Sequence, residues 1–94
     1  MITLVKSHLP NKKYDAIFYN TGKIVPFGDS NYSDYTLNGD EEKRRLYRLR
    51  HRNDNLEDPF SAGALSYYLL WGNSKRINDN LKYFKKRFYN KLHA

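Results

Sequence analysis

Apolar and polar side chains alternate over residues 13–19, so that Tyr14, Ala16 and Phe18 fall on one side of an extended segment. A period of two residues is typical of a β-strand with one buried face. Residues 2–5 are short, apolar and β-branched, which also favours a strand. The sequence therefore opens with two predicted strands.

A third strand is predicted over residues 23–27, after an Asn-Thr-Gly turn at 20–22. The glycine stands where a short hairpin loop needs left-handed backbone. Pro26 has no N–H to donate, which places this strand at an edge or at the end of a sheet. Residues 1–27 are thus expected to form an antiparallel hairpin, or a three-stranded sheet that includes the N-terminus.

Residues 28–39 are rich in Gly, Asp, Ser and Asn and are long for a plain connection. We expect a loop that Tyr32 and Tyr35 hold against the core. A binding loop is the alternative interpretation.

Helical patterns begin in the second half of the chain. Asp40 can cap a helix over residues 40–52, and two glutamates follow in its first turn, where the helix dipole favours acids. Asp58 followed by Pro59 predicts the start of a second helix, 59–71. Apolar residues lie nearly all round this helix, so it belongs in the middle of the fold.

A third helix, over residues 75–89, carries the strongest periodic signal in the chain. Ser74 can cap it, and its apolar residues recur at spacings of four, three and four, as expected for a helix with one face on a core. This stripe consists of Ile77, Leu81, Phe84 and Phe88.

These elements predict an α+β fold in a single domain, residues 1–94: an N-terminal antiparallel hairpin or three-stranded sheet followed by three helices. The middle helix is expected to be central. The predicted core comprises Ile17, Phe18, Val25, Leu46, Leu49, Phe60, Ala64, Leu65, Tyr68, Leu69, Trp71, Ile77, Leu81, Phe84 and Phe88.

The composition restricts the setting and the chemistry. The chain has no cysteine, which excludes disulfides, thiol catalysis and Cys-ligated metals and favours a protein that is not secreted. The first residues lack the pattern of a signal peptide. The longest uncharged stretch, residues 59–74, is too polar and too short for a membrane span.

Charge points to an anionic partner. The net charge is +7, and residues 59–94 hold seven Lys or Arg and a single Asp. Residues 43–52 contain six Lys or Arg and no acid. Such an excess favours nucleic acid, an acidic protein surface or anionic lipid.

The predicted helices arrange these cations on faces. On the first helix, Leu46 and Leu49 should face the core, which leaves an arginine face on the opposite side. On the third helix, the lysines and Arg87 lie outside the apolar stripe. Arginine suits phosphate because its planar fork donates two hydrogen bonds at once. The candidate nucleic-acid-binding residues are Arg44, Arg45, Arg48, Arg52, Lys82, Lys86 and Arg87.

A simpler interpretation of these charges stands beside the first. Acids at a helix start and bases near its end match the helix dipole, and runs of charge often are no more than solvated faces. No zinc-finger, RRM or KH signature is present, so contact with the nucleic-acid backbone is expected rather than readout of bases.

The aromatic residues are treated mainly as core. Phe60, Tyr67, Tyr68 and Trp71 cluster in the second helix. Stacking on bases is the minority interpretation, and it requires a partly exposed Trp71 or Tyr67 beside the basic face.

No catalytic or metal site is predicted. His8, His51 and His93 are scattered, and no nucleophile-elbow, P-loop or HExxH motif occurs. A metal-dependent nuclease site from Asp29, Asp34 and His51 is a remote alternative. We expect a protein that is not an enzyme and that needs no cofactor or metal.

Several short strings occur in an order that resembles the sequences of a family of small basic proteins of unknown function encoded by giant (nucleocytoplasmic large) DNA viruses. The likeness covers roughly residues 14–88. It is carried by YSDYT at 32–36, RHR at 50–52, DPFSAGALS at 58–66, LLWG at 69–72 and YFKKRF at 83–88. Leu56 and Tyr67 depart from the family pattern, which has Trp and a basic residue there.

The resemblance implies a viral origin and packaging in the virion. We therefore expect a virion-associated protein of the host nucleus or cytoplasm that binds nucleic acid or chromatin with low sequence specificity. The alternative is a protein-interaction module that engages an acidic host nuclear protein, or that self-associates as a homodimer and structural virion component.

Overall fold

The structure is a computed structural model, and it describes residues 2–93. Its N-terminal part is a three-stranded antiparallel sheet in the order β1-β2-β3, which confirms the predicted sheet. The strands are β1 (Ile2–Lys6), β2 (Lys12–Phe18) and β3 (Lys23–Asp29).

Strand alternation divides the sheet into a core face and an open face. Phe18 pairs with Ile2, and Tyr14 pairs with Phe27, so these side chains share the core face. Ile17 is one residue out of phase and lies half-buried on the open face, so its predicted place in the core is wrong.

The hairpin turn spans residues 19–22, one residue more than predicted. Phe18 pairs with Lys23, and Gly22 has a φ of +71°, the left-handed conformation that the sequence required of it. The Gly22 N–H donates to the Phe18 carbonyl at 2.9 Å, which closes the turn.

The remaining elements of the described chain are helices, joined by turns and loops. They are α1 (Tyr35–Asn38), α2 (Glu41–Arg50), α3 (Ala62–Leu65), the π-helix η1 (Ser66–Leu70), α4 (Ile77–Arg87) and α5 (Tyr89–Leu92). The first predicted helix corresponds to α2. The second corresponds to α3 with η1, and the third to α4 with α5.

The second helix starts later than predicted. Ser61, not Asp58, is its N-cap, and the Ser61 hydroxyl accepts from the Ala64 N–H at 3.1 Å. The Asp58 carboxylate instead accepts from the Phe60 N–H at 2.9 Å and forms a local turn. Pro59 therefore lies before the helix, where it is fully buried.

The segment expected to be a loop contains the short helix α1. Asp34 caps it by accepting from the Thr36 N–H at 2.8 Å, and this buried carboxylate also pairs with Lys13. Tyr35 is buried, as expected of a residue that holds the segment to the core. Tyr32 does not do so, because it is 71% exposed.

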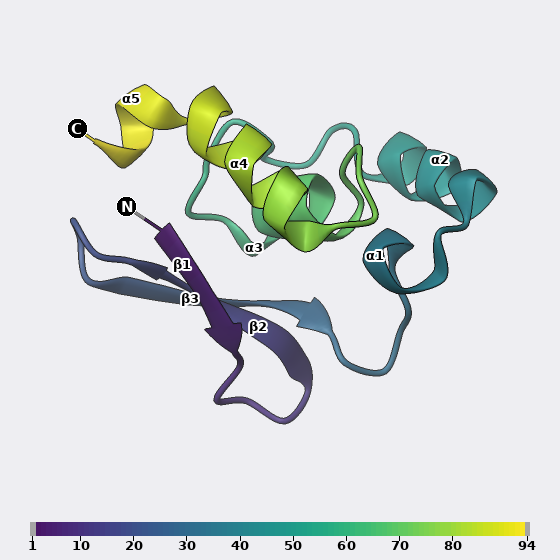
Figure 1. The fold of residues 1–94 in the computed structure, drawn as a ribbon, viewed down its shortest axis with the longest axis horizontal. Helices are drawn as coiled ribbons and strands as arrows, with labels where there is room; N and C mark the ends of the chain where they lie inside the picture. The colour runs from purple at the N-terminus through teal and green to yellow at the C-terminus, as the bar shows by residue number, and fades with distance from the viewer. Residues whose placement is uncertain (1, 94) are drawn as a thin grey trace.

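Figure 1 shows two layers, with the sheet below and α3, α4 and α5 above it. Helices α1 and α2 lie at the far end of the helical layer, beyond the end of β3 (Figure 1). The core forms between the layers. Its buried apolar residues are Ile2, Ala16, Phe18, Phe27, Ala64, Leu65, Tyr68, Leu69, Leu70, Phe84, Phe88 and Leu92.

A tight turn joins η1 to α4. The side-chain amide of Asn80 is buried in it, and it donates to the Leu69 and Ser74 carbonyls at 2.9 and 2.8 Å. Its oxygen accepts from the Ser74 N–H at 3.0 Å. A Cβ on Gly72 would come within 2.2 Å of the Tyr68 carbonyl oxygen, so only glycine fits this backbone path.

In residues 2–93, no helix is long and apolar enough to cross a membrane.

Candidate nucleic-acid interface

Helix α2 begins as its sequence predicts. Asp40 caps it by accepting from the Lys43 N–H at 3.0 Å, and Glu41 and Glu42 occupy the first turn. The helix ends at Arg50, two residues before the predicted end, and His51 is its C-cap.

The orientation of α2 is the reverse of the predicted one. Leu46 and Leu49 were expected in the core, but they are 39% and 49% exposed, and α2 has no fully buried residue. Arg44 and Arg48, expected in solvent, are half-buried and face the rest of the molecule.

Both inward arginines bind the end of η1. The Arg44 Nε donates to the Gly72 carbonyl at 2.5 Å, and its Nη2 donates to the Asn73 side chain at 2.7 Å. The Arg48 Nη1 donates to the Trp71 carbonyl at 2.8 Å. The last carbonyls of a helix lack intrahelical partners, so the two guanidinium groups act as its C-terminal cap.

Aromatic contacts fix the same two side chains. The Arg48 guanidinium lies over the Tyr67 ring at 4.0 Å, and that of Arg44 lies 5.5 Å from the Tyr35 ring centre. Burial lowers the pKa of Arg48, yet an arginine remains charged at neutral pH. These contacts stabilise the docking of α2 and leave few donors for an external anion.

The other two predicted arginines of this segment lie at the surface. Arg45 forms an exposed ion pair with Glu42 at 2.6 Å. Arg52 is exposed and has no hydrogen bond or ion pair within residues 2–93. Only Arg52 of the four is thus both exposed and unpaired.

Helix α4 follows its predicted orientation. Phe84 and Phe88 are buried, whereas Lys82 and Lys86 are exposed and form no ion pair with the described part of the chain. Arg87 differs, because it pairs with Glu57 at 2.9 Å and lies 5.0 Å from the Tyr68 ring centre.

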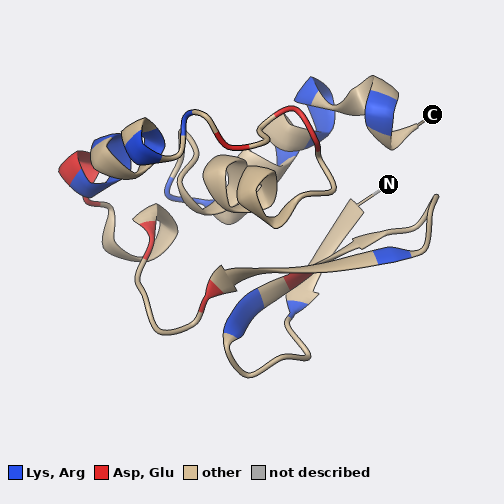
Figure 2. Ribbon diagram, turned by 180° about the vertical axis from the view of Figure 1, so that it is seen from behind, with Lys and Arg blue, Asp and Glu red and all other residues tan. Residues whose placement is uncertain are grey.

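The seven predicted residues do not form one continuous strip. Figure 2 shows the cations of α2 at one end of the helical layer and those at the end of α4 and in α5 at the other. Two of the seven cap η1 and two pair with glutamates. The other three, Arg52, Lys82 and Lys86, have no ion-pair partner in the described residues 2–93.

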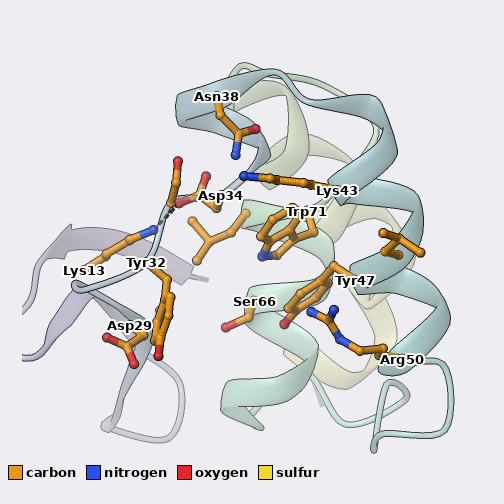
Figure 3. Close-up of a pocket in the computed structure, with 14 residues that line it drawn as sticks. Lys13, Asp29, Tyr32, Asp34, Asn38, Lys43, Tyr47, Arg50, Ser66 and Trp71 are labelled. Carbon is orange, nitrogen blue, oxygen red and sulfur yellow. Dashed lines mark hydrogen bonds and ion pairs between the residues drawn. The ribbon is translucent and has the colours of Figure 1, made fainter.

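Sequence reasoning missed a second cationic site on α2. Lys43 and Arg50 are seven residues apart and, with Leu46 and Tyr47, line a cavity of about 650 Å³ that Figure 3 shows. Leu46, Tyr47 and Arg50 follow Lys43 at three, four and seven residues, a spacing that indicates a shared helix face. It was overlooked because the leucine of this face was assigned to the core.

Within residues 2–93, no group of three or more His, Asp or Glu side chains is placed to hold a metal ion. The three residues of the remote nuclease alternative have other partners. Asp34 pairs with Lys13, the Asp29 carboxylate accepts from the Asn31 N–H, and His51 bonds Asp54.

Sheet, helical layer and exposed lysines together define a small basic α+β protein. A model of a family of unknown function (DUF5754) matches residues 2–51, more than half of the chain. The chain belongs to this family. The matched region ends at the C-cap of α2, so it holds the sheet, α1 and α2.

No curated protein matches the chain. No solved structure matches it either.

Proposed function

We propose that this protein binds nucleic acid or chromatin without catalysing a reaction, and with low sequence specificity. The observation that carries the proposal is that Lys82 and Lys86 are exposed and have no ion-pair partner within residues 2–93, on a helix whose apolar stripe packs against the core. Asp79 is the single acid of that helix and lies in its first turn. Unpaired surface cations are the groups that replace counterions along a phosphate backbone.

The proposed interface differs in its members from the sequence prediction. Lys82, Lys86 and Arg52 make the primary phosphate contacts. Arg45 and Arg87 join them by exchanging an exposed glutamate for a phosphate. Arg44 and Arg48 remain on η1 and support the interface by holding α2.

A viral setting belongs to the same proposal. The resemblance of several strings to small basic proteins of giant DNA viruses supports a protein that is packaged in the virion and acts in the host nucleus or cytoplasm. A net charge of +7 suits a protein that coats a genome or meets host chromatin.

Salt titration of oligonucleotide binding tests the proposal. The logarithm of affinity should fall linearly with the logarithm of salt concentration, with a slope of about −0.9 per phosphate contact on duplex DNA. A Lys82→Glu/Lys86→Glu variant should weaken binding equally for unrelated sequences and flatten the slope. A salt-independent affinity, or strong preference for one sequence, would contradict the proposal.

A matched control separates the local site from net charge. Lys6→Glu/Lys12→Glu changes the charge by the same amount on the sheet, where neither lysine has an ion-pair partner within residues 2–93. It should reduce affinity less than the α4 variant. Equal losses would mean that no particular surface of the protein carries the binding.

A second candidate function rests on the outward leucines of α2. Leu46 and Leu49 are exposed beside Lys43 and Arg50, and this mixture of apolar and basic groups suits an acidic partner protein. A pull-down after nuclease treatment tests it. Leu49→Ser should release the partner, whereas a pull-down that nuclease empties would reject this function.

A further inference from the structure

A cavity of about 650 Å³ opens between the loop after β3 and the helices α2 and η1. Figure 3 shows Tyr32 and Asp29 on the sheet side, and Trp71, Tyr47 and Ser66 on the helical side. This volume lies within the range of sites for small molecules. The cavity is separate from the lysines of α4.

Aromatic rings form both of its walls. Trp71 stacks on Tyr47 with ring centres 4.5 Å apart and an 8° angle between planes, and Tyr47 stacks in turn on His51 at 4.2 Å. Tyr32 stands across the cavity from them (Figure 3) and is 71% exposed. A planar group can therefore lie between Tyr32 on one side and the stacked rings that include Trp71 and Tyr47 on the other.

Unused polar groups border the same space. Trp71 is partly exposed, and its indole N–H has no acceptor within residues 2–93. Lys43 and Arg50 are exposed and unpaired within the same range. They lie two helical turns apart, on the order of 10 Å along α2, on either side of Tyr47.

The carboxylates at the cavity leave this cationic side free. Asp34 is neutralised by Lys13 and caps α1. Asp29 accepts from the Asn31 N–H and lies on the sheet side, away from α2 (Figure 3). An anion is thus attracted to the α2 side, while an uncharged planar group fits between the rings.

We propose that this cavity binds one unstacked base of a single-stranded nucleic acid, with the neighbouring phosphates held by Lys43 and Arg50. The proposal rests on the proposed function, and it adds a preference for single strands over duplex. A base buried in a duplex must leave its stack to enter the cavity, whereas an unpaired base enters without breaking a pair.

Trp71 makes the proposal directly observable, because it is the single tryptophan of the chain. A short oligothymidylate should quench the tryptophan emission saturably, with the same affinity that anisotropy of a labelled strand reports. A duplex of the same length should bind more weakly and leave the emission nearly unchanged.

Tyr32→Ala tests the wall that stacks on the base. Loss of one base–aromatic contact should lower single-strand affinity by roughly 5- to 150-fold and leave duplex affinity unchanged. Tyr19→Ala is the matched control, since Tyr19 is 61% exposed on the hairpin turn and is not one of the residues that line the cavity. It should bind both forms like the unmodified protein.

Lys43→Ala/Arg50→Ala tests the phosphate contacts. Its single-strand affinity should fall further than that of Lys6→Ala/Lys12→Ala, which removes the same charge from the sheet. Equal losses in the two double variants would overturn the role of Lys43 and Arg50.

Other outcomes would overturn the single-strand proposal in distinguishable ways. Tight duplex binding with unperturbed tryptophan emission would reject the base site and retain the proposed function. Absence of any oligonucleotide binding would reject both. Saturable binding of thymidine monophosphate as tight as that of the strand would assign the cavity to free nucleotides. Emission that changes on dilution, with a dimer in sedimentation, would assign it to a second copy of the chain.

Discussion

Helices α2 and α4 have similar lengths and similar basic composition, yet they are docked in opposite ways. Helix α4 buries Phe84, with Phe88 buried at its C-cap, and turns Lys82 and Lys86 to solvent. Helix α2 turns Arg44 and Arg48 inward and leaves Leu49 half-exposed. A basic, amphipathic helix thus has two structural outcomes within one chain.

The comparison of α2 with α4 indicates that hydrophobic periodicity determines the buried face of a helix only when the apolar stripe is large. Ile77, Leu81 and Phe84, together with Phe88 at the C-cap, give α4 a large apolar area on one side. Helix α2 has only two leucines and a tyrosine. The gain from burying them competes with the gain from hydrogen-bonding the carbonyls at the end of η1. A buried carbonyl left without a donor costs about 1–3 kcal/mol, which competes with the gain from burying one leucine.

The largest expected effect contrasts one residue from each helix. Phe84 is fully buried, so Phe84→Ala should lower the free energy of unfolding by about 3–5 kcal/mol. Leu49 is 49% exposed, so Leu49→Ala should change it by roughly 0.5 kcal/mol or less. Urea denaturation followed by circular dichroism measures both. A loss above about 2 kcal/mol in Leu49→Ala would mean that this leucine is in the core after all.

A smaller effect is expected at the docking arginines. Arg48→Ala removes the donor to the Trp71 carbonyl and should cost about 1.5–3 kcal/mol, because the bond involves a charged group. Arg52→Ala removes an exposed arginine with no partner in residues 2–93 and should be neutral in the same urea experiment. If both variants unfold at the same denaturant concentration, the cap does not stabilise α2.

The smallest effect is a change in alkaline stability. Burial, with a further contribution from Asp54, raises the pKa of Tyr47 to about 12. An unfolded tyrosine titrates near 10, so this group leaves stability intact below about pH 10 and reduces it as the pH rises towards 12. Tyr47→Phe cannot ionise, and its unfolding free energy should fall less steeply over that window. Tyr19→Phe should follow the unmodified protein; an identical slope for Tyr47→Phe would exclude the effect.

The elements predicted most accurately were those whose signals are local. The alternation around Ala16, the glycine at position 22 and the stripe through Phe84 each reflect backbone geometry of a few residues. The antiparallel hairpin of β2 and β3 and the orientation of α4 followed from these patterns.

The missed features depend on partners distant in sequence. Arg44 binds the carbonyl of Gly72, and the residue pattern within α2 does not predict that contact. Ile17 was placed in the core although the alternation that buries Phe18 points it the other way. The cavity escaped notice because Tyr32 and Trp71 come from segments that only folding brings together.

The cap formed by Arg44 and Arg48 also makes the position of α2 depend on residues that lie later in the chain. The family match ends at residue 51, yet the acceptors that anchor α2 lie at Trp71 and Gly72. A fragment cut after residue 51 would lose every one of these acceptors, along with the helices that cover Phe18 and Phe27. Residues 2–51 are therefore not expected to fold on their own, although the family match ends there. Truncation after residue 51 should leave α2 undocked and the core face of the sheet uncovered.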